Sequence, residues 1–170
     1  MFLSRRRIIL IVAIGAITGA IILLPLILAA FTAPDINSIT IKLSRIKAED
    51  STNNESIPLN LFFDIHNPTD KAMTTSKIEY KLFANGESLG QGVLSYEDIP
   101  LNGRPQLSPG LTTTLRSTFE LNQHNVNSTI VNEIKDAKPI KQIKWKIEGE
   151  AQIESAFSSS PKQFSDELNE

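Results

Sequence analysis

The chain has 170 residues, a formal net charge of −2 and no cysteine. The missing cysteine excludes disulfides, thiolate metal ligands and cysteine nucleophiles, so any folded domain must be held together by its apolar core. The only charges ahead of residue 35 are Arg5–Arg7, and the rest of the chain carries 14 basic against 19 acidic residues, a net charge of −5. A chain with this acidic balance offers no basic stripe that would neutralise phosphates, so we expect no nucleic-acid partner.

Residues 8–31 form one apolar stretch that is long enough to cross a membrane. They read IILIVAIGAITGAIILLPLILAAF, with no ionisable side chain, and as a helix they would extend about 36 Å. We therefore expect a single transmembrane helix at 8–31 in contact with the lipid bilayer, followed by a tether at 32–38. The three arginines ahead of it favour a cytoplasmic N-terminus at 1–7, which places the remaining chain on the outer side of the cell membrane.

Two other interpretations of the apolar stretch stay open. A cleaved signal peptide also begins with arginines, although its apolar region is normally shorter, and Phe31 and Pro34 interrupt the small-residue pattern of a cleavage site. A pilin-type N-terminus would assemble into a filament, but the apolar run lacks the acidic residue of such helices. Mass spectrometry of the mature protein would show whether the N-terminal segment is cleaved or retained as an anchor.

Beyond residue 38, apolar and polar side chains alternate with a period of two, which is typical of strands with one buried face. We expect strands over 39–44, 58–66, 76–84, 89–96, 111–121 and 143–154. The strand at 58–66 has the strongest apolar face and is predicted near the centre of a sheet. Trp145, on the apolar face of the last strand, is predicted to anchor the core rather than to bind a ligand.

Turn chemistry separates these strands. Asn85-Gly86 supplies the positive-φ residues of a tight type I′ hairpin, and Asn67-Pro68 is typical of a turn that ends an extended segment. Gly90 and Gly92 in the returning strand indicate a bulge or a close backbone approach. The segment 49–56, EDSTNNES, has no apolar residue and is predicted to be an exposed loop.

One segment beyond the apolar stretch, residues 126–137, has a helical pattern, and Pro139 ends it. We expect this helix to cover an open end or edge of the sheet. The tail at 155–170 is polar and acidic and is predicted to be disordered. The predicted fold is therefore mainly β, an antiparallel immunoglobulin-like or fibronectin-like β-sandwich over 39–154 with one short helix, preceded by the transmembrane helix.

The run from Leu59 to Gly92, LNLFFDIHNPTDKAMTTSKIEYKLFANGESLGQG, resembles the water stress and hypersensitive response domain of the type-2 late embryogenesis abundant family. Members show a strand ending in Asn-Pro, a strand with a central Tyr, an Asn-Gly-type turn and a return strand closing on Gly. Asn67-Pro68, Tyr80, Asn85-Gly86 and Gly90 or Gly92 occupy these places in that order. The resemblance covers most of 36–154. A membrane helix ahead of such a domain is similar to the arrangement in membrane-anchored plant members of the family.

That resemblance implies a folded, non-enzymatic sandwich linked to desiccation, cold or pathogen response. It brings no catalytic residue to this chain. After Asn67-Pro68 the sequence TDKAM is more polar than the family pattern, so the resemblance leaves the conformation of that turn open.

The chain offers little reactive chemistry. Asp64 and His66 are two apart on a predicted strand and would point to the same face, which would allow a weak metal site or an acid-base pair. The second histidine, His124, lies far away in sequence, and no third ligand motif accompanies the pair. We therefore predict an exposed polar face there, and no catalytic, metal-binding or cofactor-binding residue, no cofactor and no enzymatic activity.

Asn54 and Asn127 each begin a glycosylation acceptor triplet, whose use would require an outward-facing domain. For the whole chain we expect a membrane-tethered, extracytoplasmic binding or protective module with an unidentified protein partner at the cell surface. The alternatives are a carrier of lipid or another apolar ligand, lined by the strands and the helix at 126–137, an envelope hydrolase using His66 with a serine, and a filament subunit.

Overall fold

The computed structural model describes residues 4–32, 35–49, 56–136, 143–155 and 158–168. The chain divides into two compact units, Met1–Ala33 and Pro34–Glu170. The first unit contains one helix, α1 (Arg5–Thr32), with Pro25 inside it. Its segment Arg5–Pro25 is long and apolar enough to cross a membrane, a property that a signal sequence near the N-terminus shares. The helix predicted at 8–31 is confirmed, and it begins three residues earlier.

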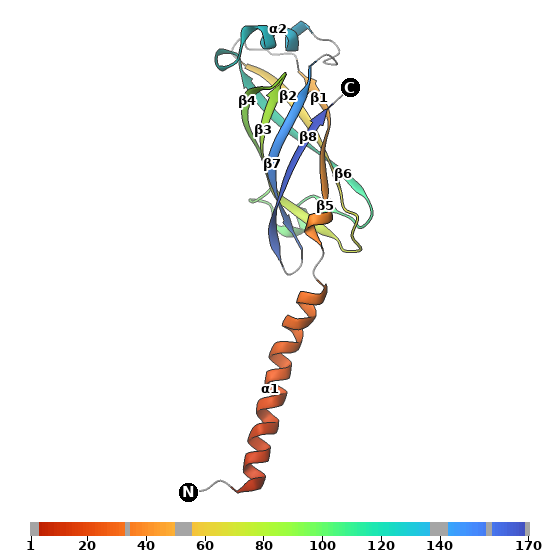
Figure 1. Ribbon diagram of the computed structural model, residues 1–170, viewed down its shortest axis with the longest axis vertical. Coiled ribbons are helices and arrows are strands. Elements are labelled where there is room, and N and C mark those ends of the chain that lie inside the picture. The colour runs from red at the N-terminus through yellow and green to blue at the C-terminus, as the bar shows by residue number, and fades with distance from the viewer. Residues whose placement is uncertain (1–3, 33–34, 50–55, 137–142, 156–157, 169–170) are drawn as a thin grey trace. The chain divides into compact units, whose positions relative to one another are not determined.

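The second unit is a sandwich of two antiparallel sheets, visible in Figure 1 as two layers of arrows. One sheet has three strands in the order β1-β2-β6, formed by β1 (Thr40–Ala48), β2 (Ser56–His66) and β6 (Thr112–Asn122). The other sheet has the order β4-β3-β7-β8, formed by β3 (Met73–Ala84), β4 (Glu87–Ser95), β7 (Trp145–Glu154) and β8 (Ser159–Leu168). A two-residue strand, β5 (Gln106–Leu107), also pairs with β3. The predicted antiparallel β-sandwich is therefore confirmed.

The core lies between the sheets and is built from every second residue of the strands. The inward side chains of β2 are all fully or nearly fully buried: Ile57, Leu59, Leu61, Phe63 and Ile65. This strand is central in its sheet, as its apolar face predicts, because β1 and β6 pair with its two edges. Trp145 is 2% exposed and belongs to the same core, which confirms the prediction for the only tryptophan in the chain.

Aromatic rings and glycines alternate along one row of the larger sheet. Gly92, Tyr80, Gly149 and Phe164 are successive partners across β4, β3, β7 and β8. A methyl group on Gly92 would collide with the Tyr80 ring, and one on Gly149 would collide with the Phe164 ring and a backbone carbonyl. The missing side chains therefore leave the space in which the two rings lie, and glycine is required at both positions.

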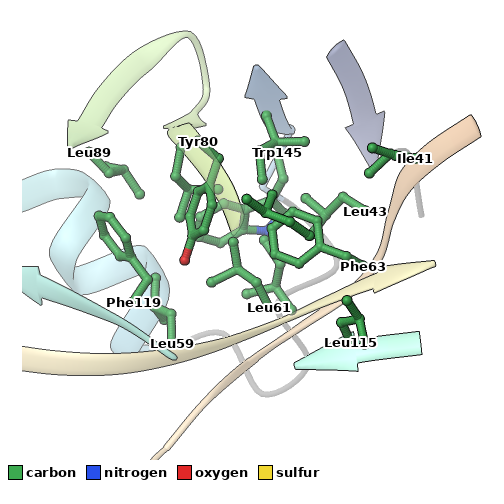
Figure 2. Close-up of a cluster of buried hydrophobic side chains, with 14 of the residues drawn as sticks. Ile41, Leu43, Leu59, Leu61, Phe63, Tyr80, Leu89, Leu115, Phe119 and Trp145 are labelled. Carbon is green, nitrogen blue, oxygen red and sulfur yellow. The ribbon is translucent and has the colours of Figure 1, made fainter. Parts of the chain in front are cut away.

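Phe63 from the opposite sheet packs against both of these rings. Its ring centroid lies 5.2 Å from that of Tyr80 and 6.3 Å from that of Phe164, the latter in an edge-to-face arrangement. Figure 2 shows Phe63, Tyr80 and Trp145 converging within the core. The Tyr80 hydroxyl also crosses the core and lies 2.7 Å from Ser117 Oγ on β6, so a buried hydrogen bond joins the two sheets.

The hairpin between β3 and β4 has the predicted geometry, with φ of 51° at Asn85 and 86° at Gly86. The pairing register shifts by one residue between Leu82 and Phe83, opposite Gly90, whose φ is 129°. The predicted bulge is therefore confirmed. Most of the predicted loop at 49–56 lies outside the described residues. Of its ends, Glu49 directly follows β1 and Ser56 is the first residue of β2.

The predicted helix is α2 (Ser128–Asp136), which lies at one end of the sandwich in Figure 1. Its apolar side chains Ile130, Val131 and Ile134 are buried in the core. Asn127 precedes the helix, and its Oδ1 accepts a hydrogen bond of 3.0 Å from the Thr129 amide, the geometry of an N-cap. Residues 137–142, where Pro139 was predicted to end the helix, lie outside the described residues. Short 3₁₀ segments occupy Ile36–Ser38, Leu101–Gly103 and Gln123–Asn125.

The predicted disordered tail at 155–170 is wrong, since most of it forms strand β8. This strand pairs with β7 along its whole length, from Trp145↔Leu168 to Glu154↔Ser159. Its polar composition hid an alternation in which Phe164 and Leu168 face the core and pack against it. Because β8 completes the larger sheet, the domain predicted to end at 154 extends to at least Leu168.

Candidate functional site

Asp64 and His66 share the outer face of the three-stranded sheet, as their spacing predicts. Each is paired with a threonine of β6: Asp64 Oδ1 accepts a hydrogen bond of 2.5 Å from Thr114 Oγ1, and His66 Nδ1 lies 3.2 Å from Thr112 Oγ1. The structure therefore surrounds this pair with hydroxyl groups of the same sheet. These contacts hold the Asp64 and His66 side chains against the neighbouring strand β6.

The two histidines are not brought together. His66 pairs with the first residue of β6, Thr112, whereas His124 follows the last residue of that eleven-residue strand. Among the residues that the structure describes, no group of three or more histidines, aspartates and glutamates is arranged to hold a metal ion.

A polar cluster around the buried side chain of Asn60, on the same outer face, was not predicted from the sequence. Asn60 is only 3% exposed, and its Oδ1 accepts hydrogen bonds from Arg116 Nε at 3.0 Å and Thr118 Oγ1 at 3.1 Å. Its Nδ2 donates to Glu49, which also forms a 3.0 Å ion pair with Arg116. The polar groups of the cluster bond to one another, and they link β2 to β6 and to Glu49 at the end of β1. The polar residue in the middle of an apolar strand was the only sequence signal for it.

The outer face of the larger sheet carries pairs of lysine and glutamate side chains that lie two residues apart on one strand. Lys146 lies 2.8 Å from Glu148, and Lys77 lies 2.5 Å from Glu79. The hydrogen bond to the neighbouring glutamate raises the pKa of each lysine above its ordinary value. These pairs lie on exposed strand surfaces and contribute little to stability.

The two sheets are joined along one side of the sandwich. The Leu43 amide of β1 donates a hydrogen bond of 2.8 Å to Asp166 Oδ2 of β8. Lys162 of β8 donates to the Asn37 carbonyl at 2.5 Å. These bonds occupy polar groups at the β1 and β8 edges with partners from the chain itself, so that side is protected against pairing with another strand.

The loops at the end of the sandwich where β1 begins are organised by Asn67, which is fully buried. Its Nδ2 donates hydrogen bonds of 2.8 Å to the carbonyls of Lys71 and Leu107, and its Oδ1 accepts bonds from Thr69 N at 3.0 Å and Thr69 Oγ1 at 2.7 Å. The Asn67 backbone amide donates to the Leu111 carbonyl at 3.0 Å. The Asn67 side chain thus ties the turn after β2 to β5, and its backbone amide ties it to the turn before β6.

Large apolar side chains are exposed at the same end. In the described part of the second unit, four large hydrophobic residues are exposed: Val93, Ile99, Leu101 and Leu111. Ile99 and Leu101 lie in the segment between β4 and β5, while Leu111 immediately precedes β6. Val93 is separate, since it lies on the outer face of β4, paired with Glu79.

Of the two glycosylation triplets, Asn54 lies outside the described residues. Asn127 is exposed at the start of α2, where its Oδ1 accepts the capping hydrogen bond.

Comparison with known proteins finds the fold in solved structures, whereas no family model and no curated protein matches the chain. A solution structure of an Arabidopsis thaliana protein is 15% identical, with a TM-score of 0.52, over 82% of this chain and 88% of that one. A crystal structure of an Archaeoglobus fulgidus protein is 18% identical, with a TM-score of 0.46, over 74% of this chain and 94% of that one. The likeness to the Arabidopsis structure shows a shared fold and nothing further.

A third solved structure, provisionally described as a late embryogenesis abundant protein, is 13% identical with a TM-score of 0.38. The match covers 91% of this chain and 85% of that one. At this TM-score the likeness carries no argument about family or function.

Proposed function

We propose that the chain is a single-pass membrane protein whose β-sandwich works outside the cytoplasm. The observation that carries the proposal is α1, whose residues 8–31 have no ionisable side chain and which is followed in sequence by a unit that forms its own core. Arg5–Arg7 supply the positive charge that keeps the short N-terminus in the cytoplasm. The absence of cysteine from the chain removes disulfides as a means of stabilising an exported domain, and the packed interior takes that role.

The sandwich acts by contact with a partner rather than by catalysis. Asp64 and His66, the residues best suited to acid-base or metal chemistry, are hydrogen-bonded to threonines of the neighbouring strand. The buried polar groups at Asn60 and Asn67 are bonded to groups of this chain. Both arrangements stabilise a rigid body that presents loops and an open edge strand, β4, to a protein at the cell surface.

The stress-related role and membership of the type-2 late embryogenesis abundant family belong to this proposal. Their support is the order of motifs in the sequence, together with the structural places those motifs occupy. Asn67 is the buried organiser of three segments, Tyr80 lies centrally in β3, and Asn85-Gly86 forms the tight hairpin. A sandwich in which these residues have structural roles fits a protective module better than an enzyme.

The alternative of an apolar-ligand carrier receives less support from the packing. A carrier groove between helix and sheets would be lined by Ile130, Val131 and Ile134, and these side chains are buried in the core instead. A titration with a fluorescent fatty acid tests the alternative, which predicts saturable binding at one site per chain.

The proposed function is tested by fractionating cells and by removing the gene product. The full chain is expected to stay with membranes after alkaline carbonate extraction, with its intact N-terminus found by mass spectrometry. A deletion mutant is expected to lose tolerance to drying, cold or osmotic shock, and re-expression of the chain should restore it. Release of a shortened chain from the membrane, or unchanged tolerance in the mutant, would contradict the corresponding part of the proposal.

A further inference from the structure

The exposed apolar residues gather at the end of the sandwich where β1 starts. Thr40, the first residue of β1, pairs with His66, and His66 pairs with Thr112. Thr40, His66 and Thr112 thus form the last paired row at this end of the smaller sheet, and Leu111 directly precedes Thr112. The segment that carries Ile99 and Leu101 joins the end of β4 to β5, which pairs with the beginning of β3, so it belongs to the same end.

These apolar residues are held on ordered backbone. The Leu111 carbonyl accepts a hydrogen bond from the Asn67 amide, and the Ile99 carbonyl accepts one of 2.9 Å from Arg104 Nε. Arg104 is itself fixed by a 2.5 Å ion pair with Glu154. Leu101 and Leu111 remain 52% and 60% exposed, although the Leu101 carbonyl accepts a hydrogen bond from the Arg104 amide and the Leu111 amide donates one to the Ser108 carbonyl. A preformed apolar surface of this kind costs little conformational entropy when it is buried against a partner.

Chain connectivity limits what that partner can be. Seven residues separate the last residue of α1, Thr32, from the first residue of β1, Thr40, and such a segment spans at most about 28 Å. With α1 in a bilayer, the end of the sandwich that bears Ile99, Leu101 and Leu111 is held within reach of the lipid surface. We propose that these three side chains insert into the membrane interface and dock the sandwich on the bilayer that holds its anchor.

The charges at this end indicate an apolar contact rather than an electrostatic one. Acidic side chains outnumber basic ones near the apolar residues, and they are Asp35, Asp70, Glu97 and Asp98. Of the nearby basic residues, Arg104 is paired with Glu154, Lys162 donates to the Asn37 carbonyl, and Lys71 lies beside Asp70. We therefore expect docking on a zwitterionic surface that is insensitive to salt and that anionic lipid weakens.

This inference rests on the proposed membrane anchor, and the test separates the two. The chain has no cysteine, so L101C, L111C and V93C each give a single site for an environment-sensitive fluorophore. Val93 is the matched control because it is 54% exposed, close to the value for Leu101, but lies on the outer face of β4. Each full-length variant is reconstituted into phosphatidylcholine vesicles that carry a headgroup-level nitroxide quencher, and native folding is checked by Trp145 emission.

Labels at 101 and 111 are expected to show blue-shifted emission and quenching several-fold stronger than the label at 93, with no change in high salt. Adding L101S to L111C is expected to weaken quenching at 111, because the residues insert together. If the chains float with the vesicles and all three labels are quenched equally, docking is wrong while the anchor stands. If the chains do not float with the vesicles, the anchor is wrong and the docking inference fails with it.

Discussion

Replacing Asn67 tests the reasoning about the loop-bearing end of the sandwich most sharply. The side chain is fully buried and makes four hydrogen bonds, two as donor to the carbonyls of Lys71 and Leu107 and two as acceptor from Thr69. Asn67→Ala removes all four and leaves the carbonyl of the fully buried Leu107 without this partner. At roughly 1 kcal/mol for each net hydrogen bond, we expect a loss of about 3–5 kcal/mol in the free energy of unfolding.

Asn67→Asp separates hydrogen bonding from side-chain size, because it changes only the donor group. The carboxylate keeps an acceptor for Thr69 but places negative charge against the Lys71 and Leu107 carbonyls. We expect this variant to be less stable than Asn67→Ala at pH 7. Burial raises the pKa of such a carboxyl group above its unfolded value, so the lost stability should return as the pH falls and the protonated group donates again.

The assay is urea unfolding of the full chain in detergent micelles, followed by Trp145 emission. Trp145 is the only tryptophan and is buried in the sandwich, so its signal reports on the second unit. Asn102→Asp is the control, since Asn102 is exposed and this change should cost less than about 0.5 kcal/mol. A loss below about 1 kcal/mol for Asn67→Ala, or equal stability of the Asn67→Asp and Asn102→Asp variants, would refute the role assigned to Asn67.

Four further predictions concern the core and its last strand. Tyr80→Phe should cost about 1–2 kcal/mol because it leaves Ser117 Oγ without its partner, and a cycle with Ser117→Ala should show coupling; simple additivity would argue against the bond. Burial raises the pKa of Tyr80, and the hydrogen bond to Ser117 partly offsets this increase. Part of the free energy of unfolding should therefore be lost as the pH rises above about 10. In alkaline urea titrations, Tyr80→Phe should show a smaller loss than the unaltered chain. Gly149→Ala should destabilise the sandwich by more than about 2 kcal/mol, because the added methyl group meets backbone and the Phe164 ring; unchanged thermal unfolding would contradict this packing. A chain ending at residue 158 lacks β8 and should lose the cooperative unfolding transition of Trp145, whereas a disordered tail would leave it unchanged.

Local chemistry made much of the fold predictable. The Asn85-Gly86 hairpin depends only on residues that tolerate positive φ, and β2 depends on an uninterrupted apolar alternation. The position of Trp145 followed from the same alternation in β7. In each case the residues that decide the structure lie next to one another in the sequence, so their effect can be read without knowing the tertiary fold.

The features that were missed depend on distant partners. Strand β8 has only two large apolar residues facing the core, and Asp166 gains its partner, the Leu43 amide, from a strand 123 positions away. Asn60 is satisfied by Arg116, which lies 56 positions along the chain, and Asn67 by the Leu107 carbonyl, 40 positions along. A polar side chain looks solvent-exposed in sequence until the fold supplies its hydrogen bonds, which explains both the misassigned tail and the unpredicted polar clusters.

Labelling of single cysteines in intact cells measures the central claim, a sandwich held outside the cytoplasm by α1, most directly. Ser4 and Ser95 are both exposed, the first ahead of α1 and the second at the end of β4, and the chain contains no other cysteine to interfere. With a membrane-impermeant maleimide, Ser95→Cys should be labelled in intact cells and Ser4→Cys only after permeabilisation. Labelling of both positions only after permeabilisation would place the sandwich in the cytoplasm and contradict the account.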